Sequence, residues 1–176
     1  DEDVIAFFAK EGEEVTDFSA FEAIDFEGDI IKIEHTWDIF SKNGEAIEED
    51  FRLITKNRNS EAIPATVNTI NPENIFIEKG AKLNFVTLNA SSGPIYIGKD
   101  SEIMEGSVVR GPLALCHNAT IKLATKIYGP TTVGPFSKVG GEVNNSVLFA
   151  YSNTGTIIKK YFAKVLLVIF FNSLLR

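Results

Sequence analysis

The chain has 176 residues, of which 44% are apolar and 23% charged, and its formal net charge is −7. This composition is typical of a folded globular domain and excludes collagen, a low-complexity disordered chain and a disulfide-rich scaffold. The negative charge disfavours nucleic acid as a partner, because phosphate backbones are bound by basic surfaces. The single cysteine, Cys116, allows no disulfide within the chain. This fits a reducing compartment, and we expect a cytoplasmic protein.

The charge is distributed unevenly along the chain. Residues 1–60 carry 17 acidic and 6 basic side chains, residues 61–150 carry seven of each, and residues 151–176 carry four basic side chains and no acidic one. Such shifts predict segments with different roles. The chain opens on Asp1 without an initiator methionine or a signal-peptide pattern, so we interpret it as part of a longer sequence.

Residues 1–70 predict a small α/β segment. Short strands are expected at residues 4–9 and 29–33. A helix is expected at residues 46–55, because Ile47, Phe51 and Ile54 share one face and acidic residues occupy the other. The side chains of Trp37, Ile39 and Phe40 either pack against a neighbouring domain or cover the core of this segment. Residues 56–70, rich in small polar side chains, are expected to be a connector.

The strongest pattern is a sixfold repeat in the second half of the chain. An aliphatic residue falls at every sixth position from 97 to 139: Ile97, Ile103, Val109, Leu115, Ile121, Ile127, Val133 and Val139. An α-helix would place successive members about 240° apart, on three different faces. A parallel β-helix explains the spacing, because each hexapeptide supplies one short strand and one corner, and three hexapeptides form one triangular coil.

Two further sets of positions fit these coils. The residues two positions before each aliphatic point inward on the same strand and are mostly small: Ile95, Ser101, Ser107, Leu113, Ala119, Thr125, Thr131 and Ser137. The expected corners carry Gly-Pro pairs at 111–112 and 129–130, eighteen residues apart, which predicts that they stack. An earlier partial coil is expected at Ile77 and Leu83, followed by an irregular crossing over residues 84–94.

Longer strings resemble a known family. They occupy residues 37–46, 95–107, 127–135 and 138–146, and the resemblance spans roughly residues 25–153. The chain resembles sugar-1-phosphate nucleotidyltransferases with a left-handed β-helix. It is similar to the bifunctional UDP-N-acetylglucosamine pyrophosphorylase/glucosamine-1-phosphate N-acetyltransferase type, in the Bacteroidetes form. The resemblance implies a mainly β fold of left-handed parallel coils and the following domain boundaries: the end of a nucleotidyltransferase-like domain with a helical arm (1–58), the β-helix (59–153) and a basic, apolar tail (154–176).

The same resemblance implies an activity and partners. In that family the N-terminal domain joins a nucleoside triphosphate to a sugar 1-phosphate with Mg²⁺, and the β-helix transfers an acetyl group from acetyl-CoA. Expected partners are a sugar 1-phosphate or nucleotide sugar and two further copies of the chain, because sites in such β-helices lie between the subunits of a homotrimer. For this chain as written we expect no cofactor of its own.

Two departures bear on catalysis. No Gly-rich phosphate-binding loop occurs in residues 1–60, and no histidine follows His117, although the family base lies on a later coil. We therefore predict no catalytic residue, and His117 and Cys116 are weak candidates. By position, Glu142 and Asn144 match residues that contact the sugar phosphate, and Tyr151 is a third substrate-binding candidate.

Several alternatives stay open at this point. Arg110, Lys126 and Lys138 are expected to face outward, where they could pair with phosphate or simply be solvated. In the tail, the apolar run at 165–171 is short of the roughly 20 residues of a membrane span, so no membrane partner is expected. The tail is either a capping helix over residues 157–171 or a sequence out of register with the family. The function is either transfer chemistry on sugar 1-phosphates or that of a non-catalytic β-helix module for trimer assembly or sugar-nucleotide binding.

Overall fold

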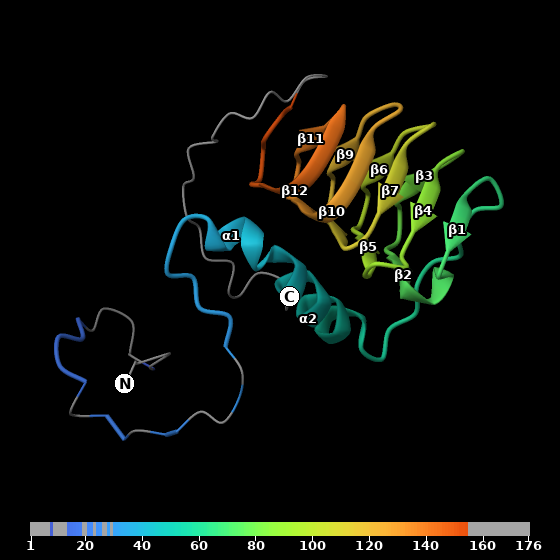
Figure 1. Ribbon diagram of the computed structural model, residues 1–176. Coiled ribbons are helices and arrows are strands. Elements are labelled where there is room, and N and C mark those ends of the chain that lie inside the picture. The colour runs from blue at the N-terminus through green and yellow to red at the C-terminus, as the bar shows by residue number, and fades with distance from the viewer. Residues whose placement is uncertain are drawn as a thin grey trace. The chain divides into compact units, whose positions relative to one another are not determined.

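The structure is a computed structural model, and it describes residues 8, 14–18, 21–22, 24–25, 28 and 30–154. The chain divides into two units, Asp1–Ile30 and Ile31–Arg176, and each is considered by itself. The described residues of the first unit contain no helix or strand. Every regular element of the described residues therefore lies in the second unit (Figure 1).

The second unit is mainly β and forms a left-handed parallel β-helix of about four coils. In chain order its elements are α1 (Asp38–Ser41), α2 (Asn43–Thr55), β1 (Asn68–Ile70), the 3-10 helix η1 (Pro72–Asn74), β2 (Ile75–Ile77), β3 (Lys82–Leu83), β4 (Thr87–Asn89), β5 (Ile95–Ile97), β6 (Glu102–Ile103), β7 (Val108–Arg110), β8 (Leu113–Leu115), β9 (Thr120–Ile121), β10 (Lys126–Val133), β11 (Lys138–Val139) and β12 (Glu142–Leu148).

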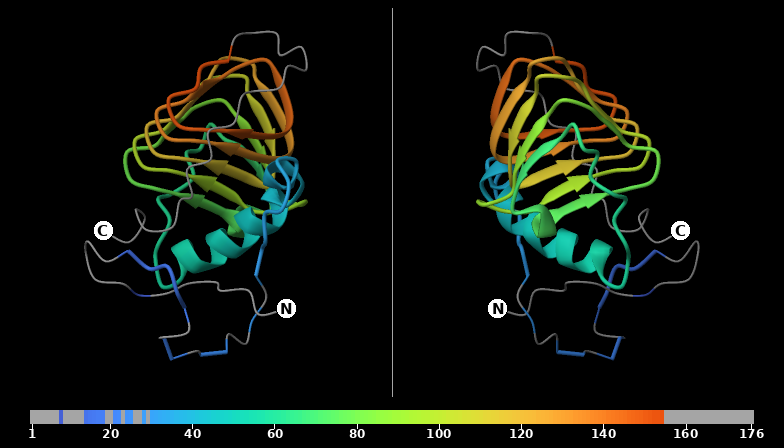
Figure 2. Two further views of the ribbon diagram at one scale, coloured as in Figure 1. Left: turned by 90° about the vertical axis from the view of Figure 1, so that its left-hand side faces the viewer. Right: turned by 90° about the vertical axis from the view of Figure 1, so that its right-hand side faces the viewer.

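The strands form three faces, which Figure 2 shows end-on as stacked triangles. The covered face consists of β2, β5, β8 and the second halves of β10 and β12. The exposed face consists of β1, β4, β7 and the first halves of β10 and β12. The third face consists of β3, β6, β9 and β11. The strands β10 and β12 turn the corner between the covered and exposed faces, so these two faces form one continuous sheet.

The core is built from the positions that the sequence predicted. The eight aliphatic side chains at every sixth position are no more than 1% exposed, and so are the eight inner residues two positions earlier. Among the latter, Ser101 Oγ and Thr125 Oγ1 each donate a 2.6 Å hydrogen bond to a backbone carbonyl, of Gly98 and Lys122 respectively. Small hydroxyl residues can therefore line the narrow interior without an unpaired buried group.

The helix α2 packs along the outside of the covered face. Register aligns the outward residues Phe76, Tyr96, Ala114 and Thr132 in one column. A 13-residue helix is about 20 Å long, and three steps between coils span about 14 Å, so α2 can cover the whole column. Figure 1 shows α2 running from the β10 side toward β2. Phe76, at the β2 end of this column, is only 5% exposed.

The end of α2 is held at the first coils by a charged and aromatic cluster. Arg58 Nη2 lies 2.8 Å from Glu78 Oε2, and its guanidinium lies 5.3 Å from the centre of the Phe76 ring. Tyr96 Oη donates a 2.8 Å hydrogen bond to the other oxygen of Glu78, and the Tyr96 and Phe76 rings stack. The segment after the helix is thus tied to the β-helix by both charge and aromatic contact.

The helix predicted at residues 46–55 is confirmed, although α2 begins three residues earlier. Ile47 is buried, and Phe51 and Ile54 are half-buried on the predicted face. The side chains of Trp37 and Phe40 are exposed, and Ile39 is half-buried, around the short helix α1. None of these three residues is therefore fully covered in the described structure.

Two local predictions were wrong. The strand predicted at residues 29–33 is not present, since residues 30–33 have no regular structure and pair with no strand among those described. The crossing at 84–94, predicted to be irregular, contains β4, which pairs with both β1 and β7. The predicted strand at 4–9, apart from Phe8, and the capping helix at 157–171 lie outside the described residues.

The last coil departs from the eighteen-residue register. Lys126 aligns with Glu142 and Val133 aligns with Leu148, so the offset between coils falls to 16 and then 15 residues. The irregularity lies at the corner after Tyr128. The β-helix continues through β12 after the last member of the sixfold repeat, Val139, but with shorter coils. None of the helices within residues 30–154 is long and apolar enough to cross a bilayer.

Candidate functional site

Two of the three predicted substrate-binding residues lie together on the exposed face. Glu142 and Asn144 alternate along the first half of β12, so both side chains point outward, and both residues are exposed. They align with Lys126 and Tyr128 of β10. Tyr128 Oη donates a hydrogen bond to Glu142 Oε1, and this bond raises the pKa of Tyr128. The Glu142 carboxylate is therefore already oriented by a neighbouring side chain.

The third predicted residue, Tyr151, lies at a different corner. Its backbone N–H donates to the carbonyl of Pro135, between the covered and third faces. The Tyr151 ring stacks on Phe136 with centroids 5.1 Å apart, and the edge of His117 meets the same Phe136 ring at 5.3 Å. The structure therefore does not bring Tyr151 to Glu142 and Asn144 within this chain.

The three basic residues considered in the sequence analysis lie on two different faces of the β-helix. Arg110 and Lys126 lie on the exposed face, on β7 and β10, whereas Lys138 lies on β11 of the third face. All three residues are exposed. Among the described residues, Arg110 forms no ion pair and no side-chain hydrogen bond, so its guanidinium is available to a ligand.

A groove runs between α2 and the corner that joins the covered and exposed faces. Its volume is about 510 Å³, which lies within the range of small-molecule sites. Nine residues line it: Gly44, Glu45 and Glu48 from α2, and Ser92, Arg110, Gly111, Pro112, Gly129 and Pro130 from the coils. The corner wall is formed by the two Gly-Pro pairs whose stacking the sequence predicted.

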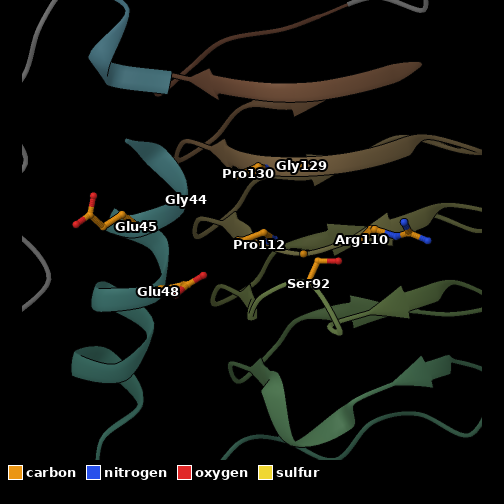
Figure 3. Close-up of a pocket in the computed structure, with 9 residues that line it drawn as sticks. Gly44, Glu45, Glu48, Ser92, Arg110, Pro112, Gly129 and Pro130 are labelled. Atoms are coloured by element: carbon orange, nitrogen blue, oxygen red, sulfur yellow. The ribbon is translucent and has the colours of Figure 1, made fainter. Parts of the chain in front are cut away.

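Figure 3 shows how the polar side chains of the groove are arranged. Glu48 extends from the helix toward the corner, whereas Glu45 points away from it. Ser92 and Arg110 belong to the coil side. The Glu48 carboxylate therefore faces the corner from the helix wall, whereas the Arg110 side chain extends along the coils away from α2. Sequence reasoning missed Glu48 and Ser92 because nothing along the chain showed which corner α2 would cover.

Glycine allows the helix to approach the corner closely. A Cβ added at Gly44 would lie 2.9 Å from Pro130 Cγ, which is closer than packed carbon atoms allow. The neighbouring residue Asn43 accepts a 2.8 Å hydrogen bond from Thr132 Oγ1 and is only 7% exposed. These contacts fix the upper end of the groove.

The surroundings of Cys116 and His117, the two weak catalytic candidates, do not favour a catalytic role. Burial raises the pKa of the Cys116 thiol to about 11, so the nucleophilic thiolate is disfavoured near neutral pH. His117 is exposed at the corner with Phe136, away from Glu142 and Asn144. Within residues 30–154 and the few described before them, no three His, Cys, Asp or Glu side chains converge on a common point.

Comparisons with known proteins give one similarity. A search of curated proteins found no match. A family model described as sugar nucleotidyl transferase matches residues 1–59, about a third of the chain. The match includes α1 and α2 and ends before β1, so it covers the helical segment that packs on the β-helix and none of the strands. Over this segment the chain is similar to sugar nucleotidyl transferases, which supports, at a coarse level, a sugar-nucleotide transferase.

Proposed function

We propose that this protein takes part in the synthesis of nucleotide sugars from sugar 1-phosphates, as a transferase of the type that makes UDP-N-acetylglucosamine. One observation carries the proposal. The segment similar to sugar nucleotidyl transferases ends just beyond α2, and α2 is packed along a parallel β-helix. A nucleotidyltransferase-like segment joined through a helical arm to such a β-helix is the arrangement that the sequence resemblance implies.

Within this function, the described part is proposed to bind the sugar phosphate rather than to carry the bond-making groups. Glu142 and Asn144 present a carboxylate and an amide beside Lys126, which suits the hydroxyl and phosphate groups of a sugar phosphate. Acetyl transfer from acetyl-CoA has less support, because His117, the single histidine of the β-helix, lies at another corner. A neutral imidazole beside the amino group would be the expected base.

The proposed assembly is a homotrimer. Large apolar side chains are exposed at the corner between the exposed and third faces, where Phe85 is 67% and Leu123 is 63% exposed. Val108 and Ile70 add apolar area on the exposed face itself. Patches of this kind are typical of contacts between subunits. In such a trimer, a neighbouring subunit would cover the exposed face of the β-helix.

The test separates the transferase from the non-catalytic module. The chain is incubated with UTP, N-acetylglucosamine 1-phosphate and Mg²⁺ while pyrophosphate release is followed, and with acetyl-CoA and glucosamine 1-phosphate while thiol release is followed. Pyrophosphate release above that of heat-denatured chain supports nucleotidyl transfer. Binding of UDP-N-acetylglucosamine without turnover supports the module. Absence of both turnover and binding overturns the proposal.

A further inference from the structure

The corner between the covered and third faces carries stacked aromatic rings that the proposed function does not use. Phe136 and Tyr151 lie on successive coils, with ring centroids 5.1 Å apart and ring planes 4° apart, and His117 meets Phe136 from the coil before. We propose that the outer face of the Tyr151 ring binds the base of a purine nucleotide and that Lys138 binds its phosphate. The inference goes beyond the proposed function, because the residues proposed to bind the sugar phosphate lie on another face of the β-helix.

Large rings at these two positions oppose the local preference of the backbone. The positions stacked in this column of the corner all have a positive φ between 55° and 82°: Gly80, Asp100, Asn118, Phe136 and Tyr151. Glycine, aspartate and asparagine tolerate this conformation, whereas a bulky side chain is strained in it. Strain of this kind is typical of functional positions, because folding alone would favour a smaller residue. The last two coils therefore display rings where stability does not require them.

The ring of Tyr151 has one free face. The residue is 77% exposed although one face of its ring contacts Phe136. A stack of parallel rings is continued best by another planar ring, because the two rings then touch over their whole area. Stacking on an aromatic side chain is a common source of affinity for nucleotide bases. A purine covers more of the tyrosine ring than a pyrimidine does, so we expect purine nucleotides to bind more tightly.

The backbone that carries Tyr151 is fixed by side chains of the preceding coils. The backbone N–H of Ser152 donates a 3.0 Å hydrogen bond to Ser137 Oγ. Lys122 Nζ donates a 2.9 Å hydrogen bond to Asn153 Oδ1. Residues 151–154 are thus held against the β-helix, so binding has to order little besides the tyrosine ring and the ligand itself. A site that is ordered in advance loses less affinity to conformational entropy.

Lys138 supplies the positive charge for the phosphate group. It aligns with Asn153, two residues beyond Tyr151, so strand geometry places its Cα about 8 Å from the Tyr151 Cα. Lys138 is exposed, and its ammonium group forms no ion pair or hydrogen bond in the described part of the chain. The residue aligned with it on β9 is Thr120, so no carboxylate competes from that strand. A lysine ammonium binds phosphate as a point charge, and a nucleoside 5′-phosphate is long enough to reach it from the ring.

The experiment uses the full chain and four probes: AMP, UMP, adenosine and ribose 5-phosphate. Calorimetry measures binding, and AMP is expected to bind more tightly than each of the other three. Tyr151→Ala should weaken AMP binding about tenfold, as expected for the loss of one stacked base, whereas Tyr151→Phe should retain it. Lys138→Gln should weaken AMP binding about fivefold and leave adenosine binding unchanged, because it removes only the charge. The matched control Lys82→Gln, on β3 of the same face, should leave AMP binding unchanged.

Each contrary result overturns the proposal. These are AMP binding that Tyr151→Ala leaves unchanged, equal affinity for AMP and ribose 5-phosphate, equal affinity for AMP and adenosine, and no binding of AMP at about 10 mM, beyond the range of weak ligands. The side chains of Tyr151 and Lys138 are exposed, so their variants should fold, and circular dichroism checks this. Since none of these measurements depends on turnover or on a sugar phosphate, failure of the transferase assay leaves this test intact.

Discussion

Asn43 and Thr132 are joined by a 2.8 Å side-chain hydrogen bond across 89 residues of sequence. The bond connects the first residue of α2 to the second half of β10, and Asn43 is buried there. Its other amide atom, Nδ2, has no hydrogen-bond partner in the described structure. Within the described structure, a single hydroxyl therefore provides the one side-chain hydrogen bond to this buried amide.

We expect Thr132→Val to destabilise the protein by about 1–3 kcal/mol, because it leaves the buried Asn43 amide without any partner. Urea unfolding of the variant and the wild type measures the difference. Thr87→Val is the matched control. Thr87 is half-buried on β4, and its hydroxyl makes no hydrogen bond in the described structure, so this change should have a much smaller effect. Equal losses for the two variants would show that the Asn43 contact contributes nothing.

Gly44→Ala should destabilise the protein, although alanine is favoured over glycine in a free helix by about 1 kcal/mol. The added methyl group would lie 2.9 Å from Pro130 Cγ and would push α2 away from the corner. The double variant Gly44→Ala/Pro130→Ala removes the obstacle and should recover stability relative to Gly44→Ala. Thermal unfolding of both variants measures this coupling. A stabilised single variant would contradict the close packing of α2.

The repeat was predictable because the inward-facing core residues of a β-helix recur at a fixed spacing along the sequence. Burial of Ile97 and of the later members follows from local chain geometry alone, and so does the stacking of the Gly-Pro pairs at 111–112 and 129–130. The shorter last coil was not predicted, because the register shift between β10 and β12 leaves no mark in the spacing before Val139.

The position of α2 was not predictable in the same way. Its amphipathic pattern predicted a helix with one buried face, but the pattern did not indicate on which of the three faces of the β-helix it packs. A usable signal was the pair of aromatic residues, Phe76 and Tyr96, twenty positions apart on the outside of successive coils. Only the covered face carries two such rings in register, and only there is an outward aromatic ring buried. The groove and its lining residue Glu48 follow from this docking, so they were missed with it.

Cys116 should react slowly with alkylating reagents in the folded protein. Burial raises its pKa from 9.0 to about 11, so the reactive thiolate is about a hundredfold rarer at pH 8 than in the unfolded chain. The rate of iodoacetamide modification against pH should therefore rise with a midpoint near 11, and denaturant should shift that midpoint to about 9. A folded-state midpoint near 9 would mean that the thiol is open to water.

Tyr96 should make the stability of the protein sensitive to alkaline pH. Its pKa is raised above the ordinary value of 10.0, first by burial and then by its hydrogen bond to Glu78. Since the folded state disfavours the phenolate, this contribution is fully present below pH 10 and is lost as the pH rises further. In a Cys116→Ala background, which removes the thiol that titrates in the same range, Tyr96→Phe should flatten the fall of urea stability between pH 9 and 11. An unchanged slope would contradict the burial of the hydroxyl.

The proposed trimer makes a prediction about one corner of the β-helix. Phe85 and Leu123 are both largely exposed there, and hydrogen bonds from Gly106 to Phe85 and from Ala124 to Glu105 place them two coils apart at this corner, with Glu105 and Gly106 on the coil between. Phe85 has a positive φ of 53°, which costs a bulky residue about 1 kcal/mol or more, so displaying its ring has an energetic cost. We expect Phe85→Glu/Leu123→Glu to convert a trimer into monomers in size-exclusion chromatography with light scattering, because carboxylates cannot be buried there unpaired. Leu53→Glu, on the exposed side of α2, should leave the trimer intact. A wild-type chain that stays monomeric at 100-micromolar concentrations, on the order needed for a weak assembly, or a double variant that stays trimeric, would contradict this interface.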